Sequence, residues 1–167
     1  MHGFFRPGTY VRRLRYEVRG LIEEHPRVYL PLARLKHNFY PGAVAVSRQT
    51  DILIEGFPRS GNSFAVTAFR LAQQRPVAVA HHFHAPAQIM AAARWGVPTL
   101  LLLRDPEDAV LSQVLRCPFL TVRQALRAYV RFYRRLQLYS HRYVLASFES
   151  VTNDFGKVIR RVNEKFG

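Results

Sequence analysis

The stretch Asp51-Ile-Leu-Ile-Glu-Gly-Phe-Pro-Arg-Ser-Gly-Asn-Ser-Phe64 decides the fold of this chain. It begins with a short apolar run that predicts a buried strand, and it continues into a turn rich in Gly, Pro and Ser. A helical pattern then runs from Ser63 to Gln73. Glycines at this spacing and a closing hydroxyl, set between a strand and a helix, are typical of a phosphate-binding loop. The glycines let the backbone approach an anion, which the first N–H groups of the helix can then bind.

The alternation of strands and helices continues along the chain. Further apolar strands are predicted at 76–80, 99–103 and 143–148, and helices at 63–73, 86–95, 121–139 and 154–166, with a short helix after Asp105. Strands that are apolar throughout and separated by helices indicate a parallel sheet covered on both faces. We therefore expect an α/β fold, a three-layer α/β/α sandwich with about four parallel strands, like that of P-loop NTPases. Ligands of such sheets bind just beyond the carboxyl ends of the strands.

Residues 1–50 are expected to form a basic N-terminal segment that packs on a domain spanning 51–167. From Tyr10 to Glu24, apolar residues recur at helical spacing, with arginines on much of the other face. We expect this helix to pack on the domain with its basic face in solvent, and a role at a membrane surface is the alternative. Residues 25–50 are interrupted by Pro26, Pro31 and Pro41, so an irregular connection is predicted.

The net charge of +14 is concentrated in the two ends of the chain. Residues 1–50 carry nine Lys or Arg against three acids and residues 113–167 carry eleven against three, while residues 51–112 hold five of each. Such flanks attract polyanions, whether nucleotides, acidic glycans, nucleic acids or anionic lipids, and charge alone does not choose among them. The single cysteine, Cys117, excludes an internal disulfide. No signal peptide or membrane span is apparent in the sequence, so a cytoplasmic protein is expected, with peripheral membrane contact through the N-terminal helix as an option.

The phosphate-binding loop departs from the nucleoside-triphosphatase pattern in one respect. The lysine expected before the closing hydroxyl is replaced by Asn62, and the cation of the loop is Arg59. The run Pro58-Arg-Ser-Gly-Asn-Ser-Phe64 resembles the 5′-phosphosulfate loop of the sulfotransferases that use 3′-phosphoadenosine 5′-phosphosulfate (PAPS). The resemblance implies that Arg59 contacts the bridging oxygen and the sulfuryl group. It also implies that Ser60, Gly61, Asn62 and Ser63 cradle the 5′-phosphate and that Phe64 lies near the adenine.

A second motif follows the third predicted strand. Asp105, Pro106 and the acids after them suit the start of a helix, because Asp caps the first turn and Pro fits the first helical position. Acids repel a phosphate, so Arg104 and Ser112 would have to bind one. The segment Arg-Asp-Pro-x-Asp-Ala-x-x-Ser, from Arg104 to Ser112, resembles the 3′-phosphate signature of the same family. By itself an arginine before a capped helix is common, and a surface salt bridge explains it equally well.

Three histidines, His81, His82 and His84, follow the second predicted strand. A base near the acceptor assists sulfuryl transfer, and imidazole titrates near neutral pH. His84-Ala85-Pro86 resembles the His-Leu-Pro of the family, which implies that His84 is the catalytic base, with His82 as the alternative. His81 is expected to be an ordinary polar residue. The carboxylates and thiols that commonly complete a metal site are not nearby, so no metal is expected.

The last third of the chain carries two further expectations. The segment from Val144 to Val151 resembles the Tyr-Glu-Asp-Leu block of the family, with Phe148 in place of the tyrosine, and a structural role is expected for Phe148 and Glu149. Four arginines of the long helix share one face opposite Leu126, Val130 and Tyr133, and they are either solvated or turned to an acidic or membrane-presented acceptor. These are Arg123, Arg127, Arg131 and Arg134. Family members usually continue to a basic lid over the nucleotide, and the chain is expected to lack it.

The resemblance covers residues 51–167 and implies a sulfotransferase that moves the sulfuryl group of PAPS to a hydroxyl or amine by in-line displacement. The sequence does not identify the acceptor, for which an acidic glycan or a glycolipid is one option, and nucleic acid is not an expected partner. Two other functions stay open: a P-loop kinase that uses ATP and magnesium, and a non-catalytic basic module that binds anions.

Overall fold

A computed structural model describes residues 7–37 and 42–167 of the chain. Four parallel strands form one sheet in the order β2-β1-β3-β4. The strands are β1 (Ile52–Gly56), β2 (Val79–His81), β3 (Thr99–Leu103) and β4 (Val144–Ser147). The helices are α1 (Pro7–Ile22), α2 (Pro26–His37), α3 (Asn62–Leu71), α4 (Pro86–Trp95), α5 (Pro106–Arg116), α6 (Val122–Leu136), α7 (Phe148–Asn153) and α8 (Phe155–Phe166), with a 3₁₀ helix, η1, at Gln137–Arg142.

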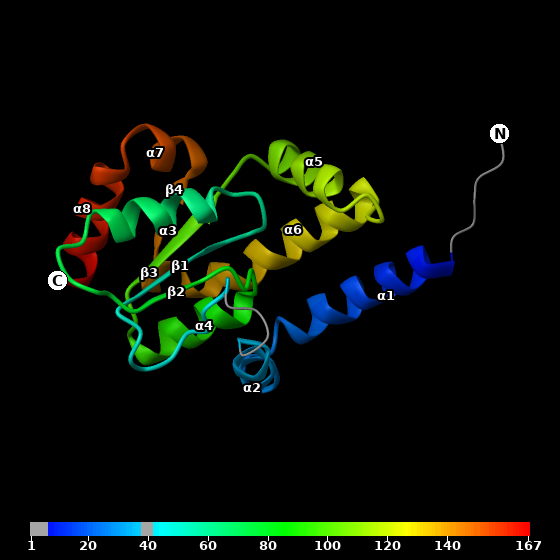
Figure 1. Cartoon of the computed structure of the whole chain (residues 1–167), viewed down its shortest axis with the longest axis horizontal. Helices are drawn as coiled ribbons and strands as arrows, with labels where there is room; N and C mark the ends of the chain where they lie inside the picture. The colour runs from blue at the N-terminus through cyan, green and yellow to red at the C-terminus, as the bar shows by residue number, and fades with distance from the viewer. Residues whose placement is uncertain (1–6, 38–41) are drawn as a thin grey trace.

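Helices cover both faces of the sheet, so the fold is the predicted three-layer α/β/α sandwich (Figure 1). Alternate residues of β1 point to opposite faces, as the pleat of a strand requires. Leu53 packs into the core formed with α4 and α6, whereas Ile52 and Ile54 pack into the core formed with α3, α7 and α8. Both cores are apolar, which explains why the strands carry little polar sequence.

Residues 26–37 correct the prediction of an irregular connection, because they form helix α2 with Pro31 inside it. A proline within a helix loses one backbone hydrogen bond. Packing compensates for that loss, since Tyr29 and Ala33 are buried against Phe83 and Ala85. Tertiary contacts thus override the local preference that the proline indicated. Pro41 lies outside the described residues.

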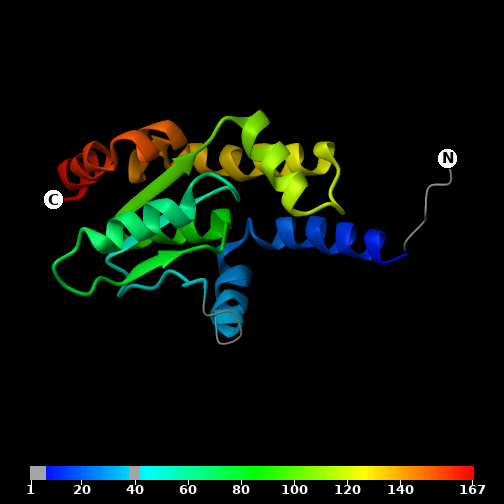
Figure 2. The ribbon, with the colours of Figure 1, turned by 45° about the horizontal axis from the view of Figure 1, so that its top comes forward.

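Helix α1 reverses the orientation that its sequence pattern predicted. It extends away from the sheet as an arm (Figures 1 and 2) and packs on α6 through polar residues. Glu17 accepts hydrogen bonds from Gln124 and Arg131, at 3.3 and 3.2 Å, and the buried Glu24 pairs with Arg131 and Arg135. Four of its apolar residues, Val11, Leu14, Val18 and Leu21, were expected to be buried and are instead exposed. Only Ile22, at the end of the helix, packs against the core beside Tyr29 and Phe83.

The arginine face predicted for the long helix is also wrong in part. The buried residues of α6 are Ala125, Tyr129, Phe132 and Leu136, while Leu126 and Val130 are exposed. Arg131 is largely covered, because it forms ion pairs with Glu17 of α1 and with Glu24, which follows the end of that helix.

The element after β4 differs from the prediction as well. The strand ends at Ser147, whose hydroxyl caps the short helix α7, so Phe148 begins a helix instead of ending the strand.

Candidate functional site

The loop between β1 and α3 has the conformation that an anion-binding loop needs. Gly61 has a φ of 85°, a left-handed value that glycine adopts without strain, and no side chain caps the start of α3. The first N–H groups of α3 therefore remain available to a ligand at the positive end of the helix dipole. Gly56 precedes the loop, and a Cβ there would lie 2.6 Å from the carbonyl oxygen of Leu102. Only glycine fits this close approach of β1 to β3.

Two loop residues expected to cradle a phosphate turn their side chains into the protein. Ser60 is completely buried, and its backbone N–H donates to the carbonyl of Phe57 at 3.2 Å. The side chain of Asn62 is buried too, and its Nδ2 donates to the same carbonyl at 3.1 Å. Both side chains hold the loop in shape. Asn62 also lines the cavity, as do Ser63 and Phe64, and of these three only Ser63 and Phe64 are exposed.

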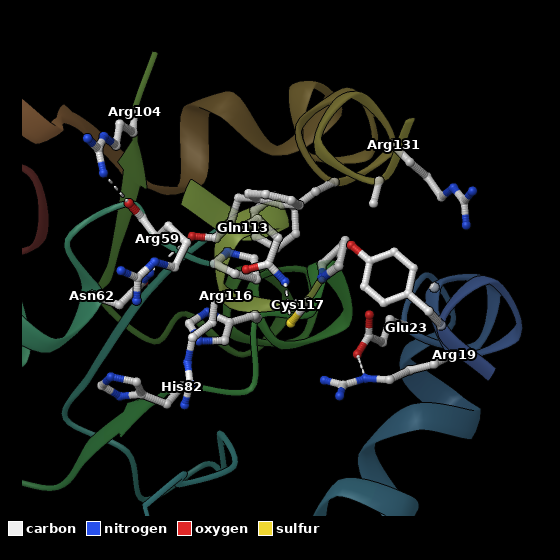
Figure 3. A pocket seen from close by; sticks show the side chains of 18 of the residues that line it. Arg19, Glu23, Arg59, Asn62, His82, Arg104, Gln113, Arg116, Cys117 and Arg131 are labelled. Carbon is white, nitrogen blue, oxygen red and sulfur yellow. Dashed lines mark hydrogen bonds and ion pairs between the residues drawn. The ribbon is translucent and has the colours of Figure 1, made fainter. Parts of the chain in front are cut away.

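The structure brings together the two arginines that the sequence placed after different strands. The guanidinium of Arg104 donates to the backbone carbonyl of Arg59 at 3.2 Å (Figure 3). Arg59 in turn donates through Nε to the hydroxyl of Ser112 at 2.9 Å. Both arginines line the same cavity. Pro58 also lines it. Ser112 is not among the lining residues, and its hydroxyl instead holds Arg59, which is.

The surroundings of Arg104 hold it in place. Its Nη2 donates to Asp108 at 3.3 Å, and its Cζ lies 4.5 Å from the ring centroid of Phe148. Its Nε is buried and has no partner among the described residues. Asp105 caps α5 by accepting from the N–H groups of Glu107 and Asp108, as predicted. Phe148 also lies where a Cβ on Gly61 would meet its ring at 3.0 Å, so its packing against the loop fits the structural role expected for it.

Two tyrosines of α6 that the sequence analysis missed support these loops. Tyr133 donates to the carbonyl of Leu102 at 2.7 Å, and its oxygen accepts from the N–H of Phe57 at 3.3 Å. Burial raises the pKa of Tyr133, so the phenol stays protonated. Tyr129 donates to the carbonyl of Arg104 at 2.6 Å. The long helix thus ties together the carboxyl ends of β1 and β3.

A chain of hydrogen bonds joins Arg70, His81, His82 and Ser63. The guanidinium of Arg70 lies 2.9 Å from Nε2 of His81, Nδ1 of His81 lies 2.7 Å from Nδ1 of His82, and Nε2 of His82 lies 3.0 Å from the hydroxyl of Ser63. Burial, with the charges of His82 and Arg70, lowers the pKa of His81 to about 4, so His81 is neutral at pH 7.

The donors and acceptors in this chain of hydrogen bonds follow from Arg70, at its start. An arginine can only donate, so Nε2 of His81 accepts and its Nδ1 carries the proton. His82 then accepts at Nδ1 and donates from Nε2 to the hydroxyl of Ser63. Burial and the charge of His84 lower the pKa of His82, which favours this neutral form. Both ring nitrogens of His82 are therefore engaged.

His84 has a different partner, the carboxylate of Glu55. Nδ1 of His84 lies 3.0 Å from the carbonyl oxygen of Gly56 and 3.5 Å from Oε2 of Glu55. A carbonyl can only accept, so Nδ1 carries the proton in the neutral ring and Nε2 is left to accept one. Burial opposes the charged imidazolium, but the hydrogen bond and charge of Glu55 outweigh it and raise the pKa of His84.

Glu55 is completely buried, and it also accepts from the backbone N–H groups of Phe83 and His84, at 2.7 and 3.2 Å. The sequence carried a signal for this role, because Glu55 is the one acid after Asp51 in an otherwise apolar predicted strand.

Backbone strain is concentrated at the same place. Among the described residues, those other than glycine with positive φ are Arg59 at 73°, His82 at 64° and His84 at 52°. All three line the cavity. Non-glycine residues in this conformation cost free energy and cluster at functional sites.

The cavity, of about 780 Å³, extends from the loop to α1. Figure 3 shows Arg59, Asn62 and His82 on one side, with Arg19 of α1 and Glu23, just after that helix, on the other. Gln113 and Arg116 of α5, and Cys117 at the end of that helix, lie between them. The sequence analysis missed this second wall, because no motif marks it and residues 1–50 were expected only to pack on the domain.

The described residues hold neither a cluster of metal ligands nor a helix that could span a membrane. Within 7–37 and 42–167, no group of three or more His, Cys, Asp or Glu side chains is arranged to hold a metal ion. The helices of the same residues include none with the length and apolar character needed to cross a membrane.

Comparison with known proteins supports the fold. Neither a protein-family model nor a curated protein sequence matches this chain. Among solved structures, the chain is similar to the mouse sulfotransferase SULT7A1 in a crystal structure with PAP, with a TM-score of 0.51 and 13% sequence identity. The match covers 74% of this chain and 61% of the mouse chain, so this chain spans less than two thirds of that protein. Together with the parallel sheet, this likeness confirms the predicted α/β fold of the P-loop type.

Proposed function

We propose that this protein binds PAPS and transfers its sulfuryl group to a hydroxyl or amine acceptor. The observation that carries the proposal is the meeting of Arg59 and Arg104 in one cavity, joined by the 3.2 Å hydrogen bond between them. A nucleotide with phosphates at both the 3′ and the 5′ position needs two such cations beside one another. The likeness to a sulfotransferase that binds PAP supports the same assignment.

His84 is the proposed base. In its neutral form Nδ1–H donates to the carbonyl of Gly56, so Nε2 can take the proton of the acceptor hydroxyl or amine. As that proton leaves, the acceptor atom forms a bond to sulfur and the bond from sulfur to the bridging oxygen breaks. Glu55 is a positioning residue, because it holds the ring of His84 and stabilises the imidazolium that forms.

Arg59 and the first N–H groups of α3 are proposed to stabilise the negative charge that builds on the leaving 5′-phosphate. Arg59 is held by its hydrogen bond to Ser112, so little reorganisation is needed during the reaction. Arg104 and Ser112 are proposed to bind the 3′-phosphate. Phe64, which is exposed at the rim of the cavity, is proposed to contact the adenine.

His82 is assigned a positioning role in place of the alternative role as base. Both of its nitrogens are engaged, one by His81 and the other by Ser63. Since His82 donates to the hydroxyl oxygen of Ser63, the hydroxyl proton of Ser63 is free to point at the 5′-phosphate. His82 thus orients the hydroxyl of Ser63 toward the phosphate and does not contact the phosphate itself.

Calorimetric titration of the purified chain tests this function. Adenosine 3′,5′-bisphosphate should bind, and Arg59→Ala and Arg104→Ala should each weaken its binding by about 1.5–3 kcal/mol, since each removes a charge-assisted hydrogen bond. Arg75→Ala is the matched control, because Arg75 is exposed in the turn after α3, outside the cavity lining, and should bind normally.

The same titration with ATP and magnesium, and with DNA, distinguishes the other functions. A preference for ATP would indicate a kinase, and binding to DNA alone, with steep salt dependence, would indicate a basic binding module. Either result would overturn the proposal. The kinase is disfavoured because Asn62, at the position of the P-loop lysine, is buried and braces the loop.

A further inference from the structure

Helix α1 presents its apolar side to solvent and its polar side to the protein. Val11, Leu14, Val18 and Leu21 follow one another at spacings of three and four residues and are 45–65% exposed. A surface helix of a globular domain ordinarily buries such a row and exposes its charges. The inner face of α1 is instead held to α6 by the ion pair of Glu17, and Glu24, just after the helix, forms two more ion pairs with α6. Packing on the domain therefore does not explain why these four positions of α1 are apolar.

Helix α2 continues this apolar surface. Val28, Leu32 and Leu35, again at spacings of four and three, are 48–63% exposed. A groove of about 410 Å³ joins the two helices. It is lined by Leu14, Arg15, Val18, Arg19, Ile22, Tyr29, Leu32 and Ala33. Two apolar rows and the groove between them thus form one surface, which we name the α1–α2 face.

The charges around the α1–α2 face are of one sign. Arg12, Arg15, Arg27 and Arg34 are exposed on the two helices. The three acids of α1 and its C-terminal end are engaged elsewhere: Glu17 and Glu24 pair with α6, and Glu23 pairs with Arg19. An apolar strip flanked by arginines matches a surface that is apolar inside and negatively charged outside.

We propose that the α1–α2 face docks on an anionic lipid bilayer, with the apolar rows among the acyl chains and the arginines at the headgroups. A second copy of the chain fits this face less well, because it would bring arginines against arginines in a protein whose net charge is +14. The apolar row of α1, from Val11 to Leu21, is about 15 Å long and lies along one helix, so it can lie in the plane of the interface. Docking does not depend on the proposed chemistry.

Co-sedimentation of the purified chain with vesicles tests the proposal. The chain should bind vesicles of phosphatidylcholine with phosphatidylserine more strongly than vesicles of phosphatidylcholine alone, and salt should weaken the binding. Leu14→Glu with Val18→Glu should lower the affinity by about tenfold or more, because it places two charges among the acyl chains. Arg12→Gln with Arg15→Gln should also weaken binding to the anionic vesicles.

Matched controls separate this face from the general basic charge. Leu71→Glu alters a leucine that is 82% exposed at the end of α3, and Arg75→Gln with Arg142→Gln removes two exposed arginines elsewhere. The single glutamate should leave binding unchanged, and the double arginine variant should weaken it less than Arg12→Gln with Arg15→Gln. All variants should keep the circular dichroism and melting of the parent chain.

Three results would overturn the proposal. One is no binding to anionic vesicles, and another is an equal loss in the test and control variants. The third is a concentration-dependent dimer in sedimentation velocity that Leu14→Glu dissolves, because the face would then be an interface between two copies.

Discussion

At the scale of the residue, the pair formed by Glu55 and His84 decides the chemistry of the proposed site. His84→Ala should spare binding of adenosine 3′,5′-bisphosphate and lower the transfer rate by about 10²–10⁴-fold, the usual contribution of a general base. Transfer of label from radioactive PAPS, with acceptors screened from extracts of the source cell, measures the rate. Normal turnover in this variant would reassign the base.

The pH dependence of the same reaction tests the role of Glu55. The carboxylate raises the pKa of His84, so the base form predominates only at higher pH. Glu55→Gln removes the negative charge, and the pKa of His84 should fall. The acidic limb of the pH–rate profile should therefore move to lower pH, with a lower maximal rate because the imidazolium is less stabilised. A purely structural role for Glu55 would lower the rate without moving the limb.

At the scale of the element, the close contact of β1 and β3 sets the position of the loop. A Cβ at Gly56 would lie 2.6 Å from the carbonyl oxygen and 2.9 Å from the Cβ of Leu102. Gly56→Ala should therefore lower the free energy of unfolding in urea by about 1–3 kcal/mol, because the two strands must move apart. Gly42→Ala is the control, since nothing lies within 4 Å of its added Cβ. Equal stability of the two variants would contradict the close packing.

At the scale of the whole molecule, the shifted pKa values of His81 and His84 should make the free energy of unfolding depend on pH. The pKa of His81 falls from 6.5 to about 4 on folding, so its contribution to stability is present above pH 6.5 and is lost as the pH falls toward 4. His84 acts in the opposite direction, because its raised pKa stabilises the fold below pH 6.5.

Urea unfolding between pH 7 and pH 4 isolates the contribution of His81. The parent chain should lose more unfolding free energy over this range than His81→Gln, which has no imidazole to protonate at that position. An identical pH dependence of the two proteins would mean that folding does not shift the pKa of His81.

The predictable parts of this protein are those that depend on neighbours in the chain. The strand Thr99–Leu103 has the predicted bounds, because an apolar run between a proline and an arginine marks both of its ends. The cap at Asp105 was predictable for the same reason. Helix α2 was not, since packing on Phe83 and Ala85, distant in sequence, compensates for Pro31. The outward apolar row of α1 was not predictable either, because ion pairs to α6 set its orientation.

The sequence by itself determined the succession of the four strands with the helices α3, α4, α5, α6 and α8, and the loop from Pro58 to Phe64, because periodicity and turn chemistry act over a few neighbouring residues. It also identified Arg59 and Arg104 as separate cations. Only the tertiary structure decided that these two arginines touch, that Glu55 serves His84, and that α1 forms a wall of the cavity. Each of these contacts joins residues far apart in the chain, so it depends on how the elements pack, which local pattern does not encode.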